Sequence, residues 1–142
     1  MSIEDIEKEI IEEFANFDDW MDKYSYIIEI GNSCPIIEEK EKTENNLIKG
    51  CQSRVWVSAK LDENGLMQIT ADSDAVITKG IITLLLRVFN NQKPEDVYSA
   101  ELKFVDEIGL KSHLSPTRSN GLLSMIKQIK LYALAFSVKQ NQ

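Results

Sequence analysis

The apolar positions follow a helical period near the start of the chain and a strand period in the middle. The first stripe recurs at steps of three and four residues, which predicts an amphipathic helix: Ile3, Ile6, Ile10, Phe14 and Phe17. Ser2 can cap this helix. A second helix is predicted after Asp18 and Asp19, ending near Gly31. Its buried face is expected to contain Trp20, Tyr24, Ile27 and Ile28.

An alternating pattern in the middle of the chain predicts a hairpin. One strand places Val55, Val57, Ala59 and Leu61 on a single face, and the return strand offers Met67, Ile69 and Ala71. Asn64-Gly65 between them is a strong signal for a tight turn. Residues 36–46 are mostly polar and predict a surface connection, followed by a short strand over 46–48. The hairpin needs helices to cover its apolar face.

The remaining apolar positions predict further helices. Residues 75–89 leave almost no polar side, so this helix is expected to be buried, with Gly80 allowing a neighbour to approach closely. Asp72 and Asp74 are interpreted as its caps. Shorter helices are predicted over 94–98 and 102–108, and Ser115-Pro116 begins the last one. Its expected seam is Leu122, Ile126, Ile129, Ala133 and Phe136. The predicted fold class is α+β, a small antiparallel sheet packed against several helices, in one domain spanning 1–142.

Charge is distributed unevenly along the chain. The formal net charge is −7, which argues against a nucleic-acid binder that neutralises phosphates. Residues 1–45 contain fourteen acids and four bases, whereas residues 111–142 contain five bases and no acid. The acidic third is either a solvated face or a docking surface for a protein. No apolar run is expected to span a bilayer, and the N-terminus does not resemble an export signal, so a cytoplasmic location with free thiols at Cys34 and Cys51 is expected.

The segment with the most specific chemistry surrounds Cys51. Gly50, Gln52 and Ser53 leave the backbone free to bend around the thiol, and Lys49 and Arg54 flank it with positive charge. Because positive charge raises the thiolate fraction, this arrangement is compatible with a reactive cysteine. A small buried hydrophobe remains the alternative.

Other chemistries have weaker support in the sequence. A single histidine and two distant cysteines do not make a zinc site, and no phosphate-binding loop is present. A thiol hydrolase would need His113 beside Cys51, which no spacing indicates. Arg118 lies in the first turn of a helix, where its charge is unfavourable, so it is expected to pair with a carboxylate or reach a partner. Trp56 is expected to be covered by a helix or to lie at a surface.

Four blocks in order resemble a known family. The first two are Trp20-x-x-x-Tyr24-x-x-Ile27-Ile28-x-x-Gly31 and Asn46-x-Ile48-x-Gly50-Cys51-Gln52-Ser53-x-Val55-Trp56. The others are Asp72-Ser73-Asp74-Ala75 with Lys79-Gly80, and His113-Leu114-Ser115-Pro116-x-Arg118-Ser119-x-Gly121-Leu122. On these blocks the chain resembles the SufE/CsdE sulfur-acceptor proteins, and most closely the SufE type.

The resemblance implies a fold shared with IscU-type scaffold proteins and a function in iron–sulfur cluster assembly. It implies that Cys51 accepts persulfide sulfur from a SufS-type or CsdA-type cysteine desulfurase, stimulates that enzyme, and passes the sulfur to a SufBCD-type scaffold. Pyridoxal phosphate then belongs to the desulfurase, so this chain is expected to bind no cofactor or metal and to be no enzyme on its own. Partners among nucleic acids or membranes are not expected.

Roles for the neighbours of Cys51 are hypotheses. Gly50, Gln52 and Ser53 would form a supporting loop that tucks the sulfur in and swings it out on docking. Asp74 and Arg118 would form a wall or docking surface beside that loop. Cys34, which the family pattern does not explain, would resolve the persulfide by forming a disulfide with Cys51.

Overall fold

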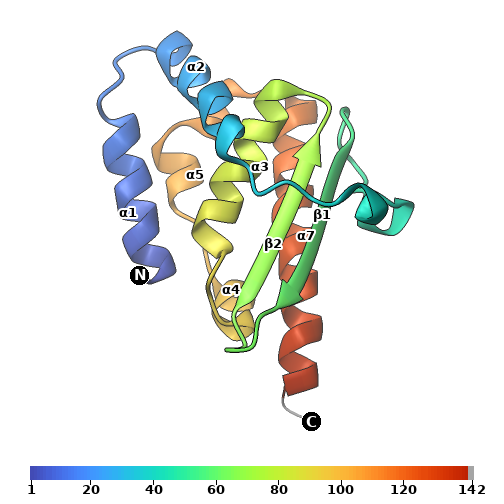
Figure 1. The fold of residues 1–142 in the computed structure, drawn as a ribbon. Helices are drawn as coiled ribbons and strands as arrows, with labels where there is room; N and C mark the ends of the chain where they lie inside the picture. The colour runs from blue at the N-terminus through green and yellow to red at the C-terminus, as the bar shows by residue number, and fades with distance from the viewer. Residues whose placement is uncertain (141–142) are drawn as a thin grey trace.

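The computed structural model of the chain describes residues 1–140 (Figure 1). Its helices are α1 (Ile3–Phe14), α2 (Trp20–Ile30), α3 (Val76–Phe89), α4 (Pro94–Ser99), α5 (Phe104–Glu107), α6 (Leu110–His113) and α7 (Pro116–Gln140). Its strands are β1 (Val55–Leu61) and β2 (Met67–Ser73), and short 3-10 turns occupy Gly31–Ser33, Glu39–Glu41 and Glu44–Asn46. The predicted α+β class is confirmed.

The two strands form the predicted antiparallel hairpin, in a register that pairs Val55 with Ser73 and Leu61 with Met67. One face of the hairpin is buried against α3, which runs beside β2, and α7, which passes behind the strands in Figure 1. The strand predicted over 46–48 is wrong, because pairing there is limited to one bridge between Leu47 and Trp56. The polar residues Glu44–Asn46, which precede Leu47, form a 3-10 turn rather than an extended ladder.

Helix α3 occupies the centre of the core, as its almost continuously apolar sequence predicts. It packs against α2 at Gly80, where a Cβ atom would lie 2.1 Å from the carbonyl oxygen of Ile27. No side chain fits in that space, so the close approach expected at Gly80 is present.

The helix caps match the predictions at α1 and α2 but not at α3. Ser2 and Asp5 form a reciprocal capping box at α1, and Asp19 caps α2. At α3 the N-cap residue is Ala75, and no side chain at this position accepts a hydrogen bond from the first amides of the helix. The interpretation of Asp72 and Asp74 as caps is therefore wrong: Asp72 pairs with the Lys42 and Lys79 side chains, and Asp74 accepts from the Arg54 amide.

Helix α7 is the longest element and its predicted seam needs correction. The fully buried positions are Leu122, Met125, Ile129 and Ala133, whereas Ile126 and Phe136 are only half-buried. On length and composition α7 could cross a membrane, contrary to the expectation from the sequence. It instead contributes this buried seam to the protein core.

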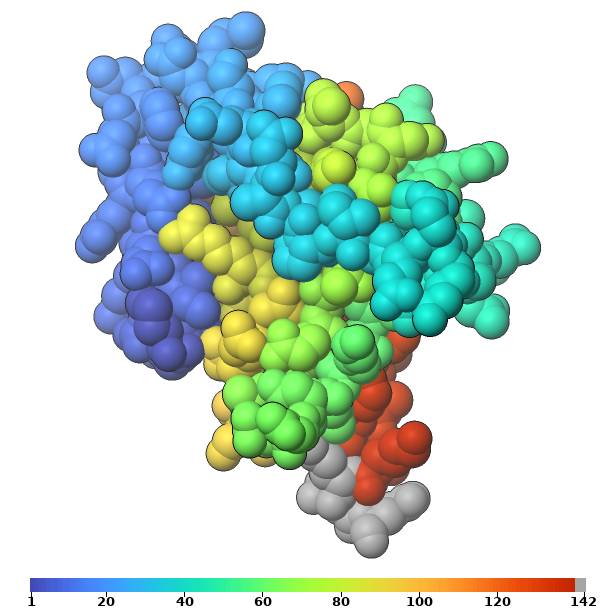
Figure 2. Space-filling model, in the orientation of Figure 1, coloured from blue at the N-terminus to red at the C-terminus, as the bar shows by residue number. Residues whose placement is uncertain are grey.

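The segment between α2 and β1 crosses the open edges of the hairpin. Ile36 bridges Ala71 of β2 in parallel, and the 3-10 turns that follow lie beside the outer edge of β1 (Figures 1 and 2). Trp56 is half-buried, with the Lys42 ammonium 5.3 Å from the centre of its ring. The expectation that a helix covers Trp56 is therefore wrong, since this segment covers it.

Candidate functional site

Cys51 lies in a loop between the bridge at Leu47 and the first residue of β1. The loop is closed at its base by a hydrogen bond from the Ile48 amide to the Val55 carbonyl (2.8 Å). Gly50 has a φ of +91°, a conformation that favours glycine. A Cβ at Gly50 would also lie 2.9 Å from the Ser124 Oγ. The backbone therefore turns tightly against α7 immediately before the thiol.

The Cys51 side chain points toward the start of α7. Its Sγ lies 3.7 Å from the Gly121 carbonyl oxygen, and a Cβ at Gly121 would lie 3.3 Å from the sulfur. A small cavity of about 40 Å³ adjoins the half-buried thiol. The residues that line it come from the loop, α3 and α7: Cys51, Gln52, Ser53, Thr78, Ile81, Thr117, Arg118, Gly121 and Met125.

Burial, rather than nearby positive charge, determines the protonation of Cys51. It raises the pKa of the thiol, because an apolar environment disfavours the thiolate. The expectation that Lys49 and Arg54 favour the thiolate is therefore not met, since both side chains extend into solvent. In this conformation Cys51 is protonated at neutral pH and is a weak nucleophile.

The structure places most of the predicted supporting residues around this sulfur. Gln52, Ser53 and Arg118 line the cavity, and the Ser53 and Thr78 hydroxyls are 3.5 Å apart. Arg118 meets no carboxylate within residues 1–140, and its Nη1 donates to the Tyr24 hydroxyl at 3.1 Å. This contact ties α2 to the wall of the cavity.

Asp74 holds the end of the loop. Its Oδ1 accepts from the Arg54 amide at 3.1 Å, while its own amide donates to the Arg54 carbonyl at 3.3 Å. Ser73 adds a hydroxyl bond to the same carbonyl at 2.8 Å. Asp74 therefore fixes the point where the loop joins β1 and is not among the residues that line the cavity.

Five residues that line the cavity were given no role at the site from the sequence: Thr78, Ile81, Thr117, Gly121 and Met125. Thr78 and Met125 face the cavity from α3 and α7, and Gly121 supplies both the carbonyl and the space beside the sulfur. A glycine inside the first turns of a helix is the signal that could have identified Gly121, because it lowers helix stability unless something packs there. No comparable signal exists for Thr78 and Met125, which occupy ordinary helix positions in the sequence.

His113 does not line the cavity around Cys51. Its ring stacks on Trp20 with centroids 4.3 Å apart, and its Nδ1 lies 2.9 Å from the Gly109 carbonyl oxygen. The pairing that a thiol hydrolase requires is therefore not formed. Within residues 1–140, no three His, Cys, Asp or Glu side chains gather to hold a metal ion.

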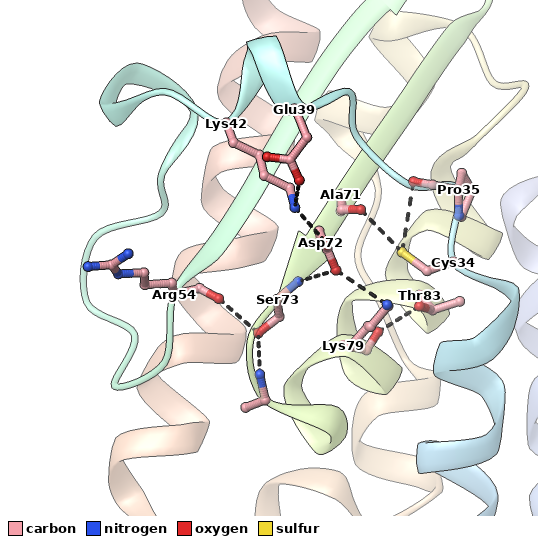
Figure 3. Close-up of polar contacts among 11 residues, drawn as sticks. Cys34, Pro35, Glu39, Lys42, Arg54, Ala71, Asp72, Ser73, Lys79 and Thr83 are labelled. Atoms are coloured by element: carbon pink, nitrogen blue, oxygen red, sulfur yellow. Dashed lines mark hydrogen bonds and ion pairs between the residues drawn. The ribbon is translucent and has the colours of Figure 1, made fainter.

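Cys34 lies in a separate polar cluster at the edge of β2 (Figure 3). Its thiol is buried and donates to the Ala71 carbonyl at 3.5 Å, and burial raises its pKa. Beside it, Asp72 pairs with Lys42 at 2.8 Å and Lys79 at 3.3 Å. Both cysteines are free thiols. A buried, protonated thiol is poorly suited to resolve a persulfide.

The arrangement of elements matches a solved structure. The solution structure of a hypothetical protein from Thermus thermophilus superimposes with a TM-score of 0.77 at 18% identity. The match covers 94% of this chain and 96% of that one. At this identity the comparison establishes the fold: an α+β domain with a small hairpin covered by helices.

The family is established by sequence. The family model of SufE, described as an Fe-S metabolism associated domain, matches residues 8–133. This range is most of the chain and includes Cys51 and every residue that lines its cavity. The chain therefore belongs to the SufE family and has a role in iron–sulfur metabolism.

Proposed function

We propose that this protein accepts sulfur from a cysteine desulfurase onto Cys51 and carries it to an iron–sulfur scaffold of the SufBCD type. Membership of the SufE family supports a desulfurase as the partner. The observation that carries the proposal is the half-buried Cys51 thiol, held on a glycine-hinged loop beside a cavity that accommodates one additional atom. Both thiols are free, as is typical of the reducing cytoplasm in which we place the protein.

The proposed transfer is a thiol exchange without net oxidation or reduction. The Cys51 thiolate attacks the terminal sulfur of a cysteine persulfide on the desulfurase. The bond between the two sulfurs of that persulfide breaks, the desulfurase thiolate leaves, and Cys51–S–S⁻ forms. The proton lost from Cys51 balances the one that the leaving thiolate takes up. Pyridoxal phosphate acts on the desulfurase before this step, so the proposal requires no cofactor on this chain. Removing the persulfide would stimulate the desulfurase.

The cavity offers protection for the transferred sulfur. Its volume of about 40 Å³ exceeds the minimum of about 10–15 Å³ that a cavity needs to hold one water molecule. One terminal sulfur would fit there, where a bulky thiol would be hindered from approaching it. The Ser53 and Thr78 hydroxyls and the Gly121 carbonyl provide polar atoms beside that space. Shelter of this kind would prolong the lifetime of the persulfide between donor and scaffold.

Because the thiol is sheltered, sulfur transfer requires a conformational change of the loop, which we call the gate, that exposes Cys51. Burial keeps Cys51 protonated, so the exchange needs a conformation in which the sulfur is exposed and ionises more readily. Gly50, with its positive φ against Ser124, is the hinge at which the loop would move. We expect docking of the desulfurase to favour the exposed conformation.

The function is tested by adding the protein to a cysteine desulfurase with cysteine as substrate and measuring alanine release. The native chain is expected to raise the turnover, and Cys51→Ser is expected to abolish the increase. Cys34→Ser is the matched control, because it removes a thiol that lies outside the cavity. Stimulation by Cys51→Ser equal to that of the native chain would refute the assignment of Cys51.

The gate is tested separately by alkylation. A bulky maleimide is expected to react slowly with Cys51 in the protein alone and several times faster when the desulfurase is present. A Cys34→Ser background ensures that only one thiol of this chain is followed. Equal rates with and without the desulfurase would show that docking does not expose the sulfur.

A further inference from the structure

A second cavity, of about 480 Å³, lies between the first turns of α1 and the residues of α4. This volume is within the range of about 300–1,000 Å³ that is usual for small-molecule sites. None of its lining residues belongs to the Cys51 cavity. Its α1 wall, which extends from Ser2 to Glu7, precedes the range 8–133 that the SufE model matches. A ligand bound here would therefore be additional to the sulfur chemistry.

Two buried polar side chains form the inner wall of this cavity. Within residues 1–140, four polar side chains are buried, and Glu7 and Gln92 are two of them, at 4% and 8% exposed. Glu7 is the only charged residue among the four. Burying a charged or polar group is costly, so the polar atoms of such side chains are ordinarily paired.

Each of these two side chains leaves one oxygen without a partner. The Glu7 Oε2 accepts from the amides of Lys103 (2.6 Å) and Phe104 (2.9 Å), but within residues 1–140 no group donates to its Oε1. The Gln92 Nε2 donates to the Met1 carbonyl at 2.9 Å, and its Oε1 likewise has no donor in the described part of the chain. No fully buried side-chain oxygen or nitrogen among the described residues lacks a partner, so solvent reaches both free oxygens. The cavity that both side chains line is where a ligand would meet them.

The rim of the cavity is acidic. Glu4, Asp96 and Glu101 are exposed there, and Lys103 is the one base among the lining residues. Together with Glu7, the lining has four carboxylates against one ammonium group, which leaves a formal charge of −3. Within residues 1–140, no three His, Cys, Asp or Glu side chains gather closely enough to hold a metal ion. The negative charge of the lining is therefore distributed over the cavity and not concentrated at one point.

We propose that this cavity binds a linear polyamine, a small molecule whose ammonium groups are separated by methylene chains. One ammonium group would donate to the free oxygens of Glu7 and Gln92, and the others would pair with the separate carboxylates of the rim. Ile3 and Ala100 also line the cavity and offer apolar contact to the methylene groups. Aliphatic amines remain protonated at neutral pH, as the lysine ammonium does with its pKa of about 10.4.

The test is calorimetric titration of the protein alone with spermidine, a linear triamine. One molecule is expected to bind per chain. Glu7→Gln removes the charge but keeps an oxygen for the Lys103 and Phe104 amides, and it is expected to raise the Kd about tenfold. Glu101→Gln, at the exposed rim, is expected to raise the Kd about threefold.

Two further variants separate binding in the cavity from general attraction to a protein of net charge −7. Ser99→Phe places a ring at the cavity wall without changing the charge, and it is expected to raise the Kd tenfold or more. Glu63→Gln is the matched control, because it removes one exposed carboxylate outside the cavity and should change the Kd less than twofold. Urea unfolding of each variant identifies any loss that comes from the fold.

Four results would overturn the proposal. The first is the absence of saturable binding, and the second is a Kd that Glu63→Gln raises as much as Glu101→Gln does. The third is full displacement of spermidine by Mg²⁺ at matched ionic strength, which would show that any cation serves. The fourth is tighter binding of a trilysine peptide than of spermidine, which would assign the cavity to a basic protein segment. No desulfurase is present in these titrations, so each result leaves the assignment of Cys51 unchanged.

Discussion

Replacing Gly121 with alanine tests whether the space beside Cys51 is required. The new methyl group would lie 3.3 Å from the Cys51 Sγ, a contact tight enough that the sulfur must move, and it would occupy part of the cavity of about 40 Å³. Alanine is favoured over glycine in a helix by about 1 kcal/mol, which offsets the tight contact. We therefore expect the free energy of unfolding to change by less than about 1 kcal/mol.

The reactivity of the thiol is expected to change much more than the stability of the fold. An ordinary cysteine with a pKa of about 8.5 is about 3% thiolate at pH 7, and burial lowers that fraction for Cys51. Each pKa unit recovered by displacing the sulfur toward solvent raises the thiolate fraction about tenfold. Gly121→Ala should therefore react with iodoacetamide roughly three to ten times faster than the native site.

The assay follows iodoacetamide labelling of Cys51 at pH 7 in a Cys34→Ser background. Asn120→Ala is the matched control, because it changes an exposed residue on the same turn of α7. Once loaded with sulfur, the Gly121→Ala variant should also lose it faster to added dithiothreitol. A labelling rate equal to or below that of the control, in a variant with a native circular dichroism spectrum, would refute the sheltering role of the cavity.

Three further predictions concern the fold and the second thiol. Gly80→Ala places a Cβ 2.1 Å from the Ile27 carbonyl and should destabilise the protein by about 3 kcal/mol or more in urea unfolding; a loss below about 1 kcal/mol would contradict the packing of α2 on α3. Hydrogen bonds from Arg87 hold the pKa of Glu13 below its usual value. The stability from this pair is therefore present above pH ~4.3 and lost as the pH falls through the lower folded pKa. Glu13→Gln should cost about 1 kcal/mol at pH 7 and nothing near pH 2, and a cost independent of pH would contradict the ion pair. Cys34→Ser should accept sulfur at the native rate, since the Cys34 thiol is buried and protonated, and a slowed rate would restore its resolving role.

The helices and strands with a regular apolar period could be predicted, because the spacing of the apolar residues determines both the type of element and the face that packs on the core. The stripe from Ile3 to Phe14 and the alternation from Val55 to Leu61 determine their elements, and the two-residue signal Asn64-Gly65 determines the turn between the strands. The cap of α3 could not be predicted, because Asp72 has a stronger partner than a helix end. Lys42, thirty residues earlier in the chain, reaches it only after the 31–47 segment folds across β2.

The site was predictable in its residue types but not in its electrostatics. The block around Cys51 identified the thiol and its loop, whereas the charges of Lys49 and Arg54 indicated an ionised sulfur. Their side chains extend into solvent, and burial against Gly121 determines the pKa of Cys51. Contacts of this kind join residues seventy positions apart, so only the folded chain reveals them. The exposure of Leu123 and Leu131 on the outer face of α7 could not be predicted either, because sequence periodicity does not say which of two apolar faces the core covers.

The central claim is that Cys51 carries the sulfur atom. It is tested most directly by incubating the protein with a cysteine desulfurase and cysteine, trapping thiols with iodoacetamide, and mapping the peptides by mass without reductant. We predict one additional sulfur on the peptide that contains Cys51, released by dithiothreitol and missing in Cys51→Ser. Sulfur found on Cys34 instead, or acquired equally by Cys51→Ser, would contradict the account.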